Sequence, residues 1–315
     1  MLLPTLSLLS GALSAVLLLS LYSKSKQQNS YMKKTLLLIA TLLASYVGMA
    51  QETYHPTAEN LKAREQFQDE KFGIFLHWGL YSMMGTTEWI MTNRDINYKE
   101  YPKLAKTFYP SEFDADAWVK AIKAAGAKYI TITTRHHDGF SLFKTATSTY
   151  NSVDGTPFKR DIIKEMADAC QRNGIKLHLY YSHLDWGRED YPVGRTGTGT
   201  GRPKEKANWA SYYKFMNTQL TELLTNYGKV GAIWFDGWWD HDSDAKPFDW
   251  QLEEQYAMIH KLQPQCLVAN NHHHTPFPGE DIQIFERDLP GENKAGLSGQ
   301  SIGRLPLESC QTINE

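Results

Sequence analysis

The sequence predicts an α/β fold of the (β/α)8 type, a TIM barrel that is incomplete at its C-terminal end. From residue 70 onward, short β-branched or aromatic runs alternate with longer helical patterns, and polar side chains follow nearly every such run. Alternating strands and helices are typical of a parallel sheet. Functional groups at the ends of many strands favour a barrel over a doubly wound sheet, which would concentrate them at one switch point beside a glycine-rich loop.

The predicted elements alternate along the chain. Strands are expected at Phe72–His77, Tyr129–Thr134, Lys176–Ser182, Ala232–Phe235, Leu267–Ala269 and Ile282–Phe285. Helices are expected at Ala115–Ala125, Asp161–Asn173, Trp209–Tyr227 and Trp250–Leu262. The middle strands are apolar almost throughout, as expected when helices cover one face and packed side chains the other. Only these six strands are predicted before Glu315, where residues 306–314 approach a further element, so we expect a truncated barrel.

Composition places the chain among globular proteins with one large domain. A length of 315 residues suits a single α/β barrel. The net charge of −2 gives no electrostatic indication of nucleic-acid or anionic-membrane binding. The three cysteines are too few for a disulfide framework, and no C-x-x-C pair suggests zinc or redox chemistry. The 9 Trp and 17 Tyr suit either a large core or stacking platforms for sugars, and composition does not separate the two.

Two apolar stretches open the chain. The second begins at Met32 with two lysines, continues as an apolar run, and ends in small residues before Gln51. This pattern predicts a secretory signal peptide over residues 32–50, too short to span a bilayer comfortably. Residues 1–31 are interpreted as sequence upstream of the true start, with a membrane anchor as the alternative. We expect the mature catalytic region, residues 51–315, to be secreted or periplasmic, with no stable membrane insertion.

Two carboxylates stand at strand ends. Asp236 follows an apolar strand and precedes Gly237 and two indoles. It could cap a helix, but the aromatic surroundings favour a nucleophile or base. Glycoside hydrolysis needs a second carboxylate, and Glu286 ends the strand fifty residues later. An ion pair with a neighbouring basic residue is the alternative role for Glu286, and Glu292 and Glu308 are weaker candidates for the second carboxylate.

Histidines also gather at predicted strand ends. They are His77, His136, His137, His183 and the run 272–274. Neutral imidazoles could bind sugar hydroxyls, or the cluster could ligate a metal. His136 and His137 are adjacent, so we expect them to point to different sides of a strand, which disfavours a shared metal. No metal and no cofactor is therefore expected.

Five motifs together resemble glycoside hydrolase family 29, the retaining α-L-fucosidases. In order they are residues 72–79 (FGIFLHWG), 87–89 (TEW), 134–140 (TRHHDGF), 179–182 (LYYS) and 234–237 (WFDG). The resemblance continues through residues 308–314. In the family a further barrel strand and a C-terminal β-sandwich follow, and both are expected to be absent here.

The resemblance implies a role for each matching residue. The nucleophile position falls on Asp236, and position after a strand assigns the acid/base to Glu286. Fucose contacts fall on His77, Glu88, Trp89, His136, His137, Tyr181 and Trp234, with His272 where the family often has arginine. The implied reaction is retaining exo-hydrolysis of terminal α-L-fucosides on a fucosylated oligosaccharide or glycoconjugate. A metal-dependent barrel hydrolase and a catalytically silent fucose-binding fragment are the alternatives.

Overall fold

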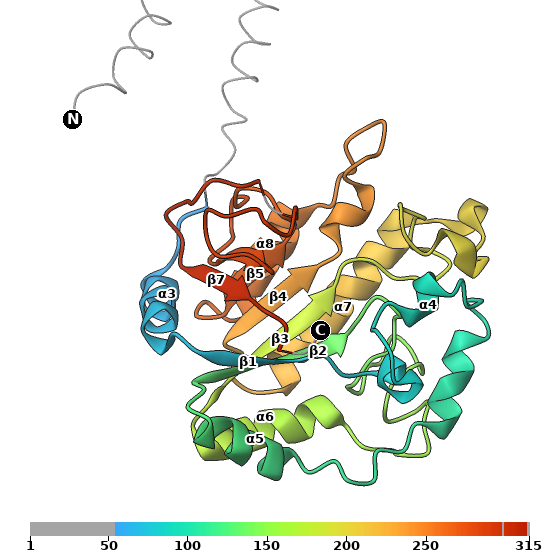
Figure 1. Cartoon of the computed structure of the whole chain (residues 1–315), viewed down its shortest axis with the longest axis horizontal. Helices are drawn as coiled ribbons and strands as arrows, with labels where there is room; N and C mark the ends of the chain where they lie inside the picture. Colours follow the sequence, from blue (N-terminus) through green and yellow to red (C-terminus); the bar gives the residue numbers. More distant parts are fainter. Residues whose placement is uncertain (1–53, 298, 314–315) are drawn as a thin grey trace, which may run out of the picture. The chain divides into compact units, whose positions relative to one another are not determined.

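The computed structural model describes residues 54–297 and 299–313 (Figure 1). The predicted signal peptide and the segment before it lie outside the described residues. Within the described part, no helix combines the length and the apolar character needed to cross a membrane.

The described residues form seven strands in two parallel sheets. The first sheet has the order β1 (Gly73–Leu76), β2 (Tyr129–Arg135), β3 (Lys176–Ser182), β4 (Ala232–Asp236), β5 (Leu267–Asn271). The second pairs β6 (Gln283–Glu286) with β7 (Leu307–Cys310). One isolated parallel bridge, between Ala269 and Ile282, joins the sheets. The predicted α/β class with parallel strands is confirmed, whereas no ladder between β7 and β1 closes the sheet among the described residues.

Helices connect the strands. They are α3 (Ala58–Glu70), α4 (Ile90–Asn93), α5 (Ala115–Ala124), α6 (Ile162–Asn173), α7 (Trp209–Asn226) and α8 (Leu252–Leu262). Short 3-10 turns are η1 (Leu80–Met84), η2 (Tyr101–Thr107), η3 (Thr198–Thr200), η4 (Lys204–Lys206) and η5 (Trp238–His241). The four predicted helices are confirmed to within two residues, and Asp161 caps α6 by accepting from the Lys164 amide at 2.9 Å. Helix α3 escaped prediction because it buries only Asn60 and Phe67 and so shows little periodicity.

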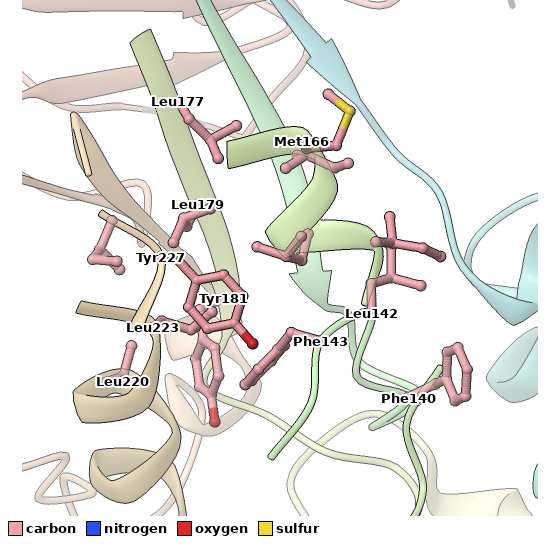
Figure 2. Packing of buried hydrophobic residues seen from close by; sticks show 14 of the residues in the cluster. Phe140, Leu142, Phe143, Met166, Leu177, Leu179, Tyr181, Leu220, Leu223 and Tyr227 are labelled. Atoms are coloured by element: carbon pink, nitrogen blue, oxygen red, sulfur yellow. The ribbon is translucent and has the colours of Figure 1, made fainter. Parts of the chain in front are cut away.

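The first sheet has two different faces, because alternate side chains of a strand point to opposite sides. On one face, Leu179, Ile233 and Phe235 belong to a core that includes residues of α5, α6, α7 and α8. On the other, which we call the inner face, Tyr180 and Trp234 pack with Phe67 of α3. Figure 2 shows part of the helix-covered core, between β3, α6 and α7. Both faces are therefore buried along most of the sheet, although the inner face also carries the polar side chain of His178.

The carboxyl ends of the strands carry the polar residues. Parallel pairing places Ser182 beside Asp236 and Asp236 beside Asn271. A cavity of about 620 Å3 opens at the other end of the strands, beside Lys176, Gly231 and Leu267. That cavity contains neither Asp236 nor Glu286, so the candidate chemistry and this cavity lie at different ends of the sheet.

Candidate active site

Asp236, the last residue of β4, is buried and surrounded by donors. Its Oδ1 accepts from the Gly237 amide at 2.8 Å and from Trp239 Nε1 at 2.9 Å. Its Oδ2 accepts from the Tyr180 hydroxyl at 3.0 Å, and His137 Nε2 lies 3.4 Å from the same oxygen. Burial alone would raise the pKa of Asp236, but donors and the nearby imidazole lower it well below its usual range. Asp236 is therefore ionised.

A glycine makes this arrangement possible. Gly237 has φ 95°, in the left-handed region, and its amide turns back onto the Asp236 carboxylate. A Cβ at this position would also meet Leu184 at 3.0 Å. The turn is what brings Trp239, three residues beyond Asp236, back over the carboxylate.

Glu286, the last residue of β6, shares a partner with Asp236. Asn271 Nδ2 donates to Glu286 Oε2 at 2.7 Å and lies 3.4 Å from Asp236 Oδ1. Those two oxygens therefore cannot be farther apart than the sum of these distances. The Glu286 side chain is 34% exposed, and burial together with the charge of Asp236 raises its pKa. The site thus pairs an ionised carboxylate with one whose pKa is raised.

Three imidazoles lie beside Asp236. The ring centroids of His136 and His137 are 4.1 Å apart, and those of His77 and His136 are 5.6 Å apart. The expectation that His136 and His137 point to different sides is wrong, because both follow the last residue of β2 and are not constrained by its pleat. Burial lowers the pKa of His136 well below its usual value. It also lowers the pKa of His77, although Glu88 and Asp236 oppose the shift. Neutral imidazoles can donate to and accept from hydroxyl groups.

Two indoles complete this side of the site. Trp89 stacks on Trp239 with centroids 5.4 Å apart, and its ring is 5.7 Å from that of His137. Glu88, the neighbour of Trp89, is half-buried and accepts from Thr87 Oγ1 at 3.1 Å. The structure thus brings most of the predicted residues to one end of the sheet: His77, Glu88, Trp89, His136, His137, Asp236 and Glu286.

Trp234 lies one layer below Asp236 on the inner face. It stacks on Tyr180 at 5.6 Å, and its Nε1 donates to Glu308 Oε1 at 2.7 Å. Glu308 is buried there, with the Tyr129 hydroxyl 3.4 Å from its other oxygen. Glu292 instead pairs with Lys294 at 2.8 Å. Among the three candidates for the second carboxylate, Glu286 is the one hydrogen-bonded to Asn271, which also contacts Asp236.

Two expected fucose contacts are placed elsewhere. Tyr181 lies fully buried in the helix-covered core, where its hydroxyl donates to Gln219 at 2.7 Å (Figure 2). Its neighbour Tyr180 contacts Asp236 in its stead, because alternate residues of β3 face opposite sides. His272 does not face Asp236 or Glu286, because its Nε2 lies 3.0 Å from Glu280. The next residue, His273, meets the site instead, with Nε2 3.7 Å from Glu286 Oε2.

Sequence reasoning gave no specific role to four residues of the site: Tyr180, Trp239, Asn271 and His273. Asn271 had a usable signal, because it lies two residues beyond the predicted strand end at Ala269 and therefore on the same side. The glycine before the two indoles was a signal for Trp239. Which of the residues 272–274 meets Glu286 depends on a left-handed turn at His273, a non-glycine residue, which the sequence does not reveal.

Within residues 54–297 and 299–313, no set of three or more His, Cys, Asp or Glu side chains could hold a metal ion. All three cysteines are free, and Cys170 and Cys266 are buried.

The sequence matches one protein family along most of its length. A sequence model of the family described as Alpha-L-fucosidase matches residues 41–315. The plasma alpha-L-fucosidase of Rattus norvegicus is 32% identical over 260 residues, covering 75% of this chain and 53% of the relative. A putative alpha-L-fucosidase of Caenorhabditis elegans is 30% identical over 240 residues, covering 70% and 47%. The chain thus spans about half the length of these curated relatives.

Solved structures agree with the sequence matches. Alpha-L-fucosidase isoenzyme 1 from Paenibacillus thiaminolyticus has 36% identity and a TM-score of 0.68, with 80% of this chain and 62% of that chain covered. The AlfC enzyme of Lactobacillus casei, solved with alpha-L-fucose product, has 29% identity and a TM-score of 0.63, with 76% and 78% covered. A mutant of AlfC was solved in complex with Fuca(1,6)GlcNAc.

Proposed function

Because the chain belongs to the alpha-L-fucosidase family, we propose that it hydrolyses terminal α-L-fucosides of oligosaccharides or glycoconjugates with retention of configuration. One observation carries the proposal: the Asn271 amide contacts two carboxylates whose pKa values are shifted in opposite directions. An ionised and a protonated carboxyl group side by side are what a retaining glycosidase requires. Retaining enzymes hold these groups about 5–5.5 Å apart, and the shared amide favours that spacing over the wider inverting one of about 6.5–9.5 Å.

In the first step, a carboxylate oxygen of Asp236 attacks the anomeric carbon of fucose. The bond to the leaving oxygen breaks, and Glu286 gives its proton to that oxygen. The product is a fucosyl ester on Asp236 and a free alcohol. Burial and the charge of Asp236 raise the pKa of Glu286, the direction that a general acid requires.

In the second step, the roles of Glu286 are reversed. Now ionised, it takes a proton from water as the water oxygen attacks the anomeric carbon. The ester bond breaks, and Asp236 leaves as a carboxylate with its charge accepted by Trp239, Tyr180 and the Gly237 amide. Two inversions give net retention.

The sugar itself would be held by the rings beside Asp236. We assign hydroxyl contacts to His77, His136, His137 and Glu88 and ring contact to Trp89. The buried Nδ1 of His136 has no hydrogen-bond partner among the described residues, which suits it to a sugar hydroxyl. Trp234 would act indirectly, by packing against Tyr180, which donates to Asp236.

We further propose that the seven parallel strands belong to a (β/α)8 barrel. Their consecutive order supports this, as does an inner face filled with side chains below the polar strand ends.

We also propose that residues 32–50 are an export signal and that the protein is secreted or periplasmic. N-terminal sequencing of the exported protein should find Gln51 first, and a start before Met32 would contradict it.

A mechanism-based label tests the nucleophile. A 2-fluoro fucosyl donor should form a stable ester on the peptide that contains Asp236, because the fluorine slows the second step. Asp236→Asn should abolish the label and lower kcat by roughly three or more orders of magnitude while the protein stays folded. Labelling of another peptide, or turnover by Asp236→Asn at the original rate, would reject the assignment.

A further inference from the structure

The segment after β5 is held by one buried carboxylate. Glu280 accepts from His272 Nε2 at 3.0 Å, from the Tyr256 hydroxyl at 3.0 Å and from the Phe277 amide at 3.1 Å. His272 in turn accepts from the His274 amide through Nδ1, at 2.9 Å. Both ring nitrogens of His272 are therefore occupied within the protein. This histidine fixes the shape of the segment and is not free to bind a ligand.

The anchored segment turns the next two histidines in different directions. His273 has φ 65°, in the left-handed region, so the chain reverses at this residue. Its Nε2 lies 3.7 Å from Glu286 Oε2. His274 is exposed, and its ring stands edge-on to Trp238 at 4.9 Å. His273 thus faces the acid/base candidate, while His274 faces the indole of Trp238.

The two indoles that follow Gly237 have different surroundings. Trp239 is buried, donates to Asp236 and stacks on Trp89. Trp238 is only half-buried and contacts the rings of His274 and Phe277, the latter at 5.5 Å. The proposed fucose site therefore accounts for Trp239 but not for Trp238.

We propose that Trp238, His274 and Phe277, which we call the outer platform, form the leaving-group subsite and bind a neutral pyranose to which fucose is attached. This inference rests on the proposed function and specifies its substrate class. Sugars present C–H faces that pack on aromatic rings. Trp238 follows the nucleophile Asp236 by two residues, and His274 follows His273, whose Nε2 lies 3.7 Å from the oxygen of Glu286 that would protonate the leaving group.

Charge and burial favour a sugar over a charged leaving group. The pKa of His274 is lowered by burial, so the ring beside Trp238 is neutral near pH 7. The same holds for His273, although Asp236 opposes the shift. The anchor at Glu280 also holds the rings in place before a ligand arrives, which reduces the entropy lost on binding.

Binding measurements on the 315-residue chain test the platform. In an Asp236→Asn background, which prevents turnover, calorimetry would compare L-fucose with Fuca(1,6)GlcNAc. Trp238→Ala should weaken the disaccharide about tenfold and His274→Ala about threefold, as expected for lost aromatic contacts. Binding of L-fucose should stay within about twofold of the parent. Trp238→Phe should recover most of the affinity, because it keeps an aromatic ring.

Matched controls separate the possible failures. Tyr109→Ala removes an aromatic ring that is 62% exposed and packs on Phe158, and it should change neither affinity. If Trp238→Ala weakens fucose and disaccharide equally, or weakens neither, the platform is not a leaving-group subsite. If the parent does not bind L-fucose, the proposed function itself fails, and this inference fails with it.

Discussion

The ends of β4 and β6 present the same chemical group in two different environments. At the end of β4, the Gly237 amide, Trp239 Nε1 and the Tyr180 hydroxyl all donate to Asp236 within 3.0 Å. At the end of β6, Glu286 accepts from Asn271 at 2.7 Å and faces the charge of Asp236. The more buried carboxylate has the lowered pKa, and the more exposed one has the raised pKa.

This difference shows that burial alone does not set a carboxyl group's protonation. Burial penalises the ionised form at both positions, but several donors aimed at one carboxylate reverse the penalty there. Once Asp236 is ionised, its charge helps to keep the proton on Glu286. The two assignments, nucleophile and acid, therefore depend on each other.

Among substitutions that keep the nucleophile Asp236, the largest effect is expected from Glu286→Ala. Hydrolysis of natural fucosides should fall by roughly 10²–10⁴-fold, because their leaving oxygen needs a proton. An activated aryl fucoside should still form the ester, which then accumulates without a base. Added azide should restore turnover and give α-fucosyl azide, since two inversions return the α configuration. Steady-state kinetics and product analysis measure both effects.

Matching substitutions at the rival carboxylates provide the control. Glu292→Ala and Glu308→Ala should show no azide rescue. Asp236→Ala should give β-fucosyl azide by direct attack. If Glu292→Ala alone gives azide rescue with the α product, the acid/base assignment moves away from Glu286.

A smaller effect should separate the two tyrosines of β3. Tyr180→Phe removes a donor to Asp236 and should lower kcat/KM about tenfold, because the nucleophile is held less firmly. Tyr181→Phe removes only the hydrogen bond to Gln219. It should leave kcat/KM within about twofold and lower the free energy of unfolding by about 1 kcal/mol. The opposite ranking of the two kinetic effects would restore Tyr181 as the sugar contact.

The shared amide should tune the pH range of activity. Activity requires Asp236 ionised and Glu286 protonated, so kcat/KM falls as pH rises through the pKa of Glu286. Asn271 donates to Glu286 and thereby lowers that raised pKa. Asn271→Ala should move the alkaline limb of the pH profile upward, by about one unit or less. A downward shift would mean that another group controls this limb.

The smallest kinetic effect is expected at Glu308, whose role we interpret as structural. Glu308→Ala leaves Trp234 Nε1 without its acceptor and should lower the free energy of unfolding by about 1–3 kcal/mol in urea titrations. Glu308→Gln keeps an oxygen acceptor and should recover most of that loss. Equal destabilisation by both substitutions would show that the hydrogen bond is not what Glu308 contributes.

The sequence alone determined the order of strands and helices and the positions of both carboxylates. An apolar run that ends in a polar residue is a local pattern, and parallel pairing brings such ends to one edge. This is why Asp236 and Glu286, far apart in the chain, could be placed together from the sequence. The same pattern singled out the histidines at strand ends, whereas the sugar contacts as a set were implied by the resemblance to family 29.

Only the tertiary structure decided which neighbour faces the site. Strand β3 alternates, with Leu177 and Leu179 on the side of Tyr181 and His178 on the side of Tyr180. Both sides are buried, however, so the alternation alone does not say which side carries the site. Among the three consecutive histidines, the hydrogen bonds of His272 to Glu280 and the left-handed backbone of His273 select which ring meets Glu286. The side of a doubly buried strand that lines a site and the direction of such a turn depend on packing partners distant in sequence. Local residue patterns alone therefore do not decide them.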